Sequence, residues 1–258
     1  MNLNKLKKNG YTTVKVKKKI INELKKDILN ILYKKIFNEK IKLKNNLFDK
    51  YFKKLNNTIN NLDQDIFLQK FGDVSFRYCN YRTGKIFNSW IVDEARKNLN
   101  FKNFSMPYPM KYQLKENKKI KRYQYCIYFR CVRSKKKDVG YIHRDVDFWN
   151  IEKPILPKSV KNYNKVFKIW IPVFGCNSRN SIKILKNSQN YDFNIKHIKK
   201  RFLKPIINKK EADLFKKIVP IKNFSNEAVM FDYSTAHFAP INQSKYFRVS
   251  AEFSLICK

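Results

Sequence analysis

Acidic residues are scarce in this chain of 258 residues: 20 Asp and Glu stand against 57 Lys and Arg, which gives a formal net charge of +37. Long apolar runs are also missing, since none approaches the roughly 18 residues that a membrane-spanning helix requires. The first ten residues, MNLNKLKKNG, lack the apolar centre of a secretory signal peptide. The sequence therefore predicts neither an integral membrane protein nor a secreted one, and we expect a cytoplasmic protein.

Cysteine is limited to five residues, an odd number with irregular spacing and no C-x-x-C pair. This pattern argues against a disulfide framework and against a zinc site. The sequence predicts free thiols in a reducing compartment instead. The five residues are Cys79, Cys126, Cys131, Cys176 and Cys257.

The basic excess has two explanations. A strongly basic surface is typical of proteins that bind nucleic acid. However, 47 of the 57 basic residues are Lys, they are spread along the whole chain, and a richness in Lys, Asn and Ile is what an AT-rich genome encodes. The sequence leaves both explanations open: a functional charge and a compositional bias.

The N-terminal quarter has the pattern of helices. Apolar residues make up 43% of the chain, enough for a sizeable core. Over residues 21–36 and 47–62 they recur at steps of three and four, which predicts two helices that cover a sheet. A further helix is predicted over residues 89–99, with Asn88 or Ser89 as its N-cap.

Beyond residue 120 the apolar residues come in short runs rich in Tyr, Phe, Val and Ile, which predicts strands. A charged turn at residues 134–138 indicates a hairpin between the first two strands. We interpret the Lys-rich stretch 190–221 as an insertion or lid at one end of the sheet, with a helix near residues 210–218. The predicted strands cover residues 123–132, 139–148, 166–174, 181–185, 227–233 and 246–256.

This order of elements predicts a helical segment over residues 1–65 and a mainly β domain over residues 66–258, which carries the insertion at about 190–221. A helical layer followed by many short strands favours a sandwich or barrel with the helices packed outside.

One group of residues has the pattern of a metal-binding site. His143 and Asp145 form an H-x-D pair, and residues two apart in a strand point the same way. An imidazole and a carboxylate aimed at one point are two thirds of the 2-His-1-carboxylate triad that binds non-heme Fe(II). His237, which follows the predicted strand 227–233, is the candidate for the third ligand.

The last predicted strand carries an anion-binding pair. Arg248 and Ser250 lie on one face of it, while Val249, Ala251 and Phe253 lie on the other. An Arg fork binds a carboxylate through two hydrogen bonds, and a neighbouring hydroxyl adds a donor. The strand after the second histidine therefore offers a place for a dicarboxylate.

The order H-x-D, distal His and R-x-S resembles the Fe(II)/2-oxoglutarate-dependent dioxygenases, and most of all their phytanoyl-CoA dioxygenase (PhyH)-like branch. Residues 167–173, FKIWIPV, resemble the W-I-P-L strand of that branch, and residues 181–189, SIKILKNSQ, resemble its S-L-x-x-x-P-G-S-H segment. His237 with Asn242, Ser244 and the R-x-S pair resembles its H-x-x-x-x-N-x-S ending. The departures are Lys186-Asn187 for Pro-Gly and Gln189 for His, and the resemblance covers roughly residues 120–256.

The resemblance implies a fold and a set of roles. The fold is a double-stranded β-helix, or cupin-like jelly roll, with the metal inside one end. Fe(II) is held by His143, Asp145 and His237. 2-Oxoglutarate chelates the metal and pairs with Arg248, with Ser250 assisting and Ser181 and Tyr128 as further cofactor-binding candidates. O2 is the co-substrate, ascorbate is an optional reductant, and the products include succinate and CO2. Related halogenases lack the carboxylate ligand, so Asp145 favours hydroxylation.

The substrate stays open at this stage. We expect a small molecule, such as a sugar, a lipid or a secondary metabolite, and the Lys-rich insertion favours an anionic one. An AlkB-like oxidative demethylase acting on nucleic acid is the alternative that the charge suggests, although no Arg-rich or aromatic-interleaved patch for stacking bases accompanies it. A non-catalytic module on a decayed barrel is a third hypothesis, against which the complete ligand set argues.

Overall fold

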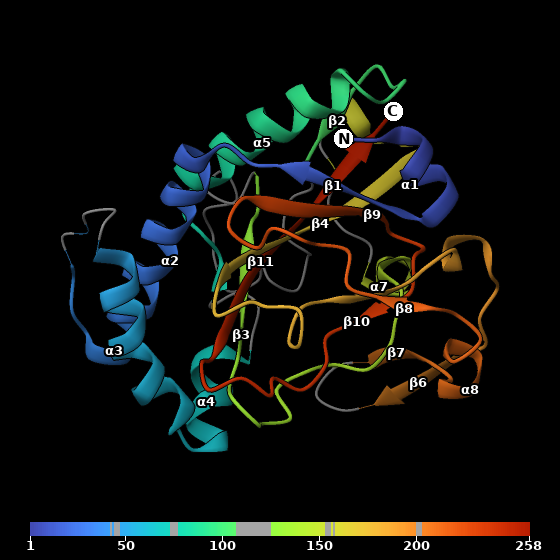
Figure 1. Ribbon diagram of the computed structural model, residues 1–258. Coiled ribbons are helices and arrows are strands. Elements are labelled where there is room, and N and C mark those ends of the chain that lie inside the picture. Colours follow the sequence, from blue (N-terminus) through green and yellow to red (C-terminus); the bar gives the residue numbers. More distant parts are fainter. Residues whose placement is uncertain are drawn as a thin grey trace.

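The computed structural model describes residues 1–41, 43, 47–72, 77–106, 125–152, 156, 158–199 and 203–258 (Figure 1). Its larger sheet has six antiparallel strands in the order β1-β9-β4-β11-β2, with β3 also pairing to β11. These strands are β1 (Tyr11–Lys15), β2 (Phe104–Ser105), β3 (Tyr128–Val132), β4 (Lys165–Phe174), β9 (Glu227–Asp232) and β11 (Arg248–Cys257).

A smaller sheet has the order β10-β5-β8, and a hairpin of β6 and β7 lies apart from it. Figure 1 shows the smaller sheet and the hairpin on one side of the molecule and helices α2 and α3 on the other. The strands are β5 (Lys183–Leu185), β8 (Lys217–Ile218), β10 (His237–Phe238), β6 (Ile195–Lys199) and β7 (Leu203–Ile207).

The helices are mostly in the N-terminal part of the chain. They are α1 (Leu3–Asn9), α2 (Lys18–Phe37), α3 (Phe48–Asn60), α4 (Gln64–Phe71) and α5 (Tyr81–Arg96), followed later by α7 (Asp145–Glu152) and α8 (Lys209–Ala212). Short 3-10 turns cover Lys158–Val160 and Ser188–Asn190. No helix in the described ranges is long and apolar enough to cross a bilayer.

Side-chain alternation divides the larger sheet into two faces. Ile169 and Ile171 of β4 and Phe253 of β11 pack into the main core, where they share a cluster with Leu24 of α2 and Phe87 of α5. The other face has a different partner. There, Trp170, Val229 and Phe231 pack against Ile182 and Ile184 next to or within the smaller sheet. The result is a helical layer, the larger sheet and the smaller sheet, stacked in that order, which agrees with the predicted mainly β core covered outside by N-terminal helices.

The buried face of α2 explains why it forms and allows a test of the packing. Leu24 is fully buried in the main core. We expect Leu24→Ala to lower the free energy of unfolding by about 3 kcal/mol, because the lost apolar contacts leave a cavity. Urea denaturation measures this, with the exposed Lys26→Ala on the same helix as a control that changes stability by less than about 0.5 kcal/mol. Equal effects of both substitutions would contradict this packing.

Most of the predicted strands are present, but the second one is wrong. The predicted strand over residues 139–148 does not form: after an irregular loop, α7 begins at Asp145, so the predicted hairpin is absent as well. Asp145 and Asp147 lie in the first turn of α7, where carboxylates favour the positive end of the helix dipole. This local preference, and the bond from the Val146 N–H to the Tyr233 carbonyl, outweigh the strand preference of the Tyr, Val, Ile and Phe residues in this run.

Two other predicted elements are shifted. The helix predicted over 89–99 begins earlier, at Tyr81, because Asn80 caps it by accepting a bond from the Thr83 N–H. The helix predicted near 210–218 ends at Ala212, and β8 follows within the same stretch. Of the predicted elements, residues 123–124 and 200–202 lie outside the described residues.

The N-terminal segment also contributes a strand that the sequence did not predict. β1 pairs with β9 along its whole length, from Tyr11 opposite Phe231 to Lys15 opposite Glu227. The 190–221 stretch contains the β6–β7 hairpin in addition to α8 and β8. The domain division at residue 65 stays a prediction.

Candidate metal centre and its cavity

Two histidines that are far apart in the sequence are joined through their backbones. The His143 N–H donates to the His237 carbonyl at 3.2 Å, and the His237 N–H donates back to the His143 carbonyl at 3.0 Å. This isolated bridge extends the pairing of the short strand β10 and leaves the two imidazole centroids 4.5 Å apart. The backbone pairing thus places both rings before any metal binds.

Both imidazole rings have the same tautomer. His143 Nδ1 lies 2.7 Å from the Tyr141 carbonyl oxygen, and His237 Nδ1 lies 3.0 Å from the Thr235 carbonyl oxygen. A carbonyl only accepts, so each Nδ1 carries the proton and each Nε2 keeps its lone pair. This is the orientation in which second hydrogen bonds hold metal-binding histidines.

Asp145 completes the group from the first turn of α7. Its Oδ2 atom is buried, has no hydrogen-bond partner and lies 3.8 Å from His237 Nε2. One ligand atom from each of His143, Asp145 and His237 can be chosen so that all lie within 4.8 Å of one another. Two imidazole nitrogens and one carboxylate oxygen on one side of a point suit Fe(II) and leave the other side open. The residues therefore fit the metal that the sequence predicts.

The protonation state of His143 agrees with a ligand role. Burial lowers the pKa of His143 to about 4, and the neighbouring His237 adds to this effect. Its imidazole is therefore neutral at pH 7, which is the form that binds metals.

Arg248 and the two candidate serines are buried but incompletely paired. Arg248 is only 1% exposed; its Nη1 donates to the Asn180 carbonyl, while its Nε has no partner. Ser181 and Ser250 are fully buried and their hydroxyls have no partner either. Leaving a buried donor unsatisfied costs about 1–3 kcal/mol. An anion bound between these groups, such as a carboxylate, would satisfy them.

The unsatisfied groups are concentrated at this site. Eight buried side-chain polar atoms among the described residues lack a hydrogen bond, and five of them belong to Arg130, Asp145, Ser181, Arg248 and Ser250. Buried polar atoms in proteins normally have partners, so a local excess of exceptions points to a ligand.

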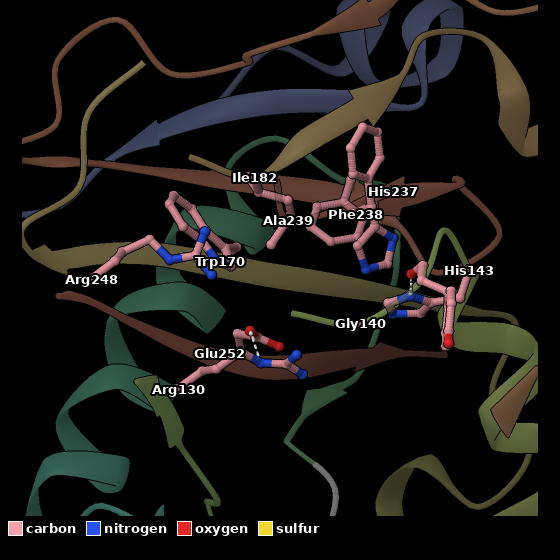
Figure 2. A pocket seen from close by; sticks show the side chains of 12 residues that line it. Arg130, Gly140, His143, Trp170, Ile182, His237, Phe238, Ala239, Arg248 and Glu252 are labelled. Carbon is pink, nitrogen blue, oxygen red and sulfur yellow. Dashed lines mark hydrogen bonds and ion pairs between the residues drawn. The ribbon is translucent and has the colours of Figure 1, made fainter. Parts of the chain in front are cut away.

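A cavity joins the histidines to Arg248. It is a partly open pocket that spans about 430 Å³ of non-atom space, and this figure includes solvent at its mouth. Figure 2 shows His143 and His237 at one end, Arg248 beside Trp170 at the other, and the Arg130–Glu252 pair below. The walls come from both sheets, and they are formed by Arg130, Gly140, Tyr141, His143, Trp170, Ile182, Phe231, His237, Phe238, Ala239, Arg248 and Glu252.

Tyr128, predicted as a cofactor-binding residue, lies in a charged cluster behind the cavity. Its hydroxyl donates to Glu252 Oε2 at 3.1 Å and accepts from Lys168 Nζ at 2.6 Å. Lys168 and Glu252 were not predicted as site residues. The sequence signal that could have identified them is a charged residue on the inward-facing side of an otherwise apolar strand.

Opposite charges set the ionisation of this cluster. Burial opposes the charge on Lys168, but Asp145, Tyr128 and Glu252 outweigh it and raise the pKa of this lysine. Burial likewise opposes the charge on Glu252, but Arg130 and Lys168 lower its pKa to about 2. Both side chains are therefore charged at pH 7.

The 190–221 stretch packs against the loop that carries His143. The Ile207 N–H donates to the Ile142 carbonyl at 2.9 Å, and Arg144 Nη1 donates to the Tyr191 carbonyl at 3.2 Å. The guanidinium of Arg144 also lies over the Phe193 ring. This stretch therefore supports the residues on either side of His143.

The departures from the PhyH-like pattern have structural explanations. Asn187, which replaces Gly, has a φ of 67°, and asparagine tolerates this left-handed conformation better than most residues. Gln189, which replaces His, donates from Nε2 to the Lys7 carbonyl and so connects this loop to α1.

The chain resembles solved structures along nearly its whole length. EctD from S. alaskensis with 2-oxoglutarate and 5-hydroxyectoine aligns with a TM-score of 0.57 at 11% identity, over 98% of this chain and 74% of that one. The non-heme monooxygenase ThoJ in its apo form aligns with a TM-score of 0.53 at 8% identity, over 98% and 76%. EvdMO1 aligns with a TM-score of 0.57 at 11% identity, over 99% of this chain and 49% of that one.

The chain has the fold of these oxygenases. The predicted fold class is therefore confirmed, and the two facing sheets are consistent with a jelly roll. A scan against protein-family profiles gave no match, and a search of curated protein sequences gave none either. At these identities the likeness establishes the fold, and the activity has to be argued from the site.

Proposed function

We propose that this protein is an Fe(II)- and 2-oxoglutarate-dependent oxygenase that hydroxylates a small molecule. The observation that carries this proposal is the convergence of two imidazoles and one carboxylate within 4.8 Å, beside a cavity whose far end holds the buried Arg248. A metal-ligand triad and a carboxylate-binding arginine at opposite ends of one cavity match the two ends of 2-oxoglutarate.

Each residue of the proposed site has a role that follows from its position. His143, Asp145 and His237 hold the metal and leave its other side open to the cavity. Arg248 binds the distal carboxylate of 2-oxoglutarate, with the hydroxyls of Ser250 and Ser181 as additional donors. When bound, the iron, O2 and 2-oxoglutarate supply the oxidising chemistry, with succinate and CO2 as products and ascorbate as an optional reductant.

The similar structures support this assignment of cofactors. One EctD structure contains 2-oxoglutarate, and another, with a TM-score of 0.55 at 10% identity, contains Fe. ThoJ is described as a non-heme monooxygenase. A place in the PhyH-like branch and a cytoplasmic location are parts of the same proposal.

The substrate face of the cavity is amphipathic. Trp170, Phe231 and Phe238 provide apolar walls, and Arg130 and Glu252 provide charges. The Nε of Arg130 is buried without a hydrogen bond and lies 3.6 Å from Glu252 Oε1. We therefore assign Arg130 to the recognition of an anionic group on a small substrate. The similar structures give no support to a nucleic-acid substrate, and that alternative is not favoured.

An anaerobic spectrum tests the proposed function. Fe(II) added with 2-oxoglutarate to the protein should give a weak visible charge-transfer band, whereas Fe(II) alone or Zn(II) with 2-oxoglutarate should give none. Under air, the same mixture should convert 2-oxoglutarate to succinate. Absence of both the band and succinate in the wild-type protein would contradict an oxygenase and favour a non-catalytic module.

A further inference from the structure

Four charged or polar side chains lie next to one another between the sheets, and two of them, Arg130 and Glu252, also line the cavity. We call Tyr128, Arg130, Lys168 and Glu252 the inner cluster. They come from three adjacent strands. Glu252 of β11 lies opposite Tyr128 of β3, Arg130 is two residues further along β3, and Lys168 comes from β4. Burying such groups is unfavourable unless they are paired. These four pair with one another, and the question is what a buried charged cluster does beside the metal centre.

Within this cluster Lys168 is held from several sides. Its Nζ donates to the Tyr128 hydroxyl at 2.6 Å and lies 3.8 Å from Glu252 Oε2. Its side chain is only 8% exposed. Glu252 is held in turn by Tyr128 and by Arg130. The ammonium group therefore has a defined position.

The ammonium group points at one metal ligand. Lys168 Nζ lies 3.8 Å from Asp145 Oδ1, while Asp145 Oδ2, the other oxygen of the same carboxylate, lies 3.8 Å from His237 Nε2. Lys168 thus attracts one oxygen and leaves the second one on the side of the histidines. At 3.8 Å the pair is an ion pair and not a hydrogen bond, so the carboxylate keeps its freedom to bind a cation.

We propose that Lys168 is a positioning residue that orients Asp145, so that a single carboxylate oxygen is presented to the metal. The inference rests on the proposed metal site. The low dielectric of the interior strengthens the Lys168–Asp145 attraction relative to one at the surface. Tyr128 and Glu252 hold the ammonium at this distance from Asp145. This gives the two further buried polar groups a role beside the metal centre.

Cobalt binding tests this inference without any turnover. Co(II) is titrated into the anaerobic protein, and its visible d–d bands report both affinity and coordination. We expect Lys168→Met to weaken Co(II) binding by about 10-fold to 100-fold, as is usual when a group that orients a metal ligand is removed. The bands should also change shape, because the carboxylate is no longer held by one oxygen. Lys168→Arg, which keeps the charge, should restore most of the affinity and the wild-type spectrum.

A matched control and a milder variant separate this effect from folding. Lys165→Met removes another ion-paired lysine of β4, whose partner is Asp232, and should leave Co(II) binding unchanged. Tyr128→Phe removes only the hydroxyl that accepts from Lys168 and should weaken binding by about 3-fold, since it loosens the ammonium. Circular dichroism checks that each variant is folded.

The outcomes are distinct. Wild-type affinity in Lys168→Met, or in Tyr128→Phe if Lys168→Met does not fold, would overturn the inference. So would a Lys168→Arg variant that binds Co(II) as weakly as Lys168→Met. If Co(II) binding depends on Lys168 but the wild-type protein does not turn over 2-oxoglutarate, the inference would stand and the proposed function would be contradicted. A wild-type protein that binds no Co(II) would overturn both.

Discussion

Replacing His237 with alanine is expected to abolish Fe(II)-dependent turnover of 2-oxoglutarate. In the proposed site its imidazole supplies one of the three ligand atoms, and the substitution removes that atom while the backbone pairing with His143 can remain. Removing a ligand outright should cost more than the 10-fold to 100-fold that follows loss of a supporting group, so we expect metal affinity to fall by more than about 100-fold. Titration with Co(II) and the charge-transfer band measure this loss.

The third histidine provides the matched control. His197 lies exposed on β6, outside the group of ligand atoms. His197→Ala should therefore keep wild-type metal affinity and turnover. Asp145→Ala should behave as His237→Ala does, since it removes the carboxylate from the same group. If His237→Ala retained the charge-transfer band, the assignment of the metal centre would be wrong.

Replacing Arg248 with methionine is expected to separate 2-oxoglutarate binding from stability. Truncating one partner of a buried charge pair costs about 2–5 kcal/mol, which corresponds to a loss of affinity of about 30-fold to 4,000-fold. In the absence of a ligand, however, the Nε of Arg248 is buried without a partner. An apolar side chain of similar size removes this unpaired donor but also the bond from Nη1 to the Asn180 carbonyl, so the melting temperature should change little.

Thermal melts and calorimetry check this prediction. 2-Oxoglutarate should raise the melting temperature of the wild-type protein, because it binds only the folded state, and should not raise that of Arg248→Met. Arg248→Lys should be intermediate, since it keeps the charge and loses the planar fork. The exposed Arg96→Met on α5 is the control. Unchanged 2-oxoglutarate affinity in Arg248→Met would refute its role, provided that Co(II) binding stays intact.

Local patterns predicted much of the fold because they depend on neighbouring residues only. The three- and four-residue spacing of apolar side chains in α2 and α3 reflects one buried helix face, and the β-rich runs of β4, β9 and β11 reflect buried strands. The failure at residues 139–148 has the same origin. There, a short run rich in Tyr, Phe, Val and Ile indicated a strand, but the bridge at His143 and the helix start at Asp145 depend on distant partners, His237 and Tyr233.

The candidate site divides in the same way. Residue type and order predicted His143, Asp145, His237 and Arg248 as one group, because the chemistry of the proposed site requires those side chains whatever the surrounding packing. Only the tertiary structure decided that Lys168 faces Asp145 and that Glu252 faces Arg130, since these contacts depend on the registers of β3 and β4 against β11 and on where α7 places Asp145. A register is a relation between strands far apart in the chain, and a shift by one residue would turn each side chain to the opposite face of the sheet.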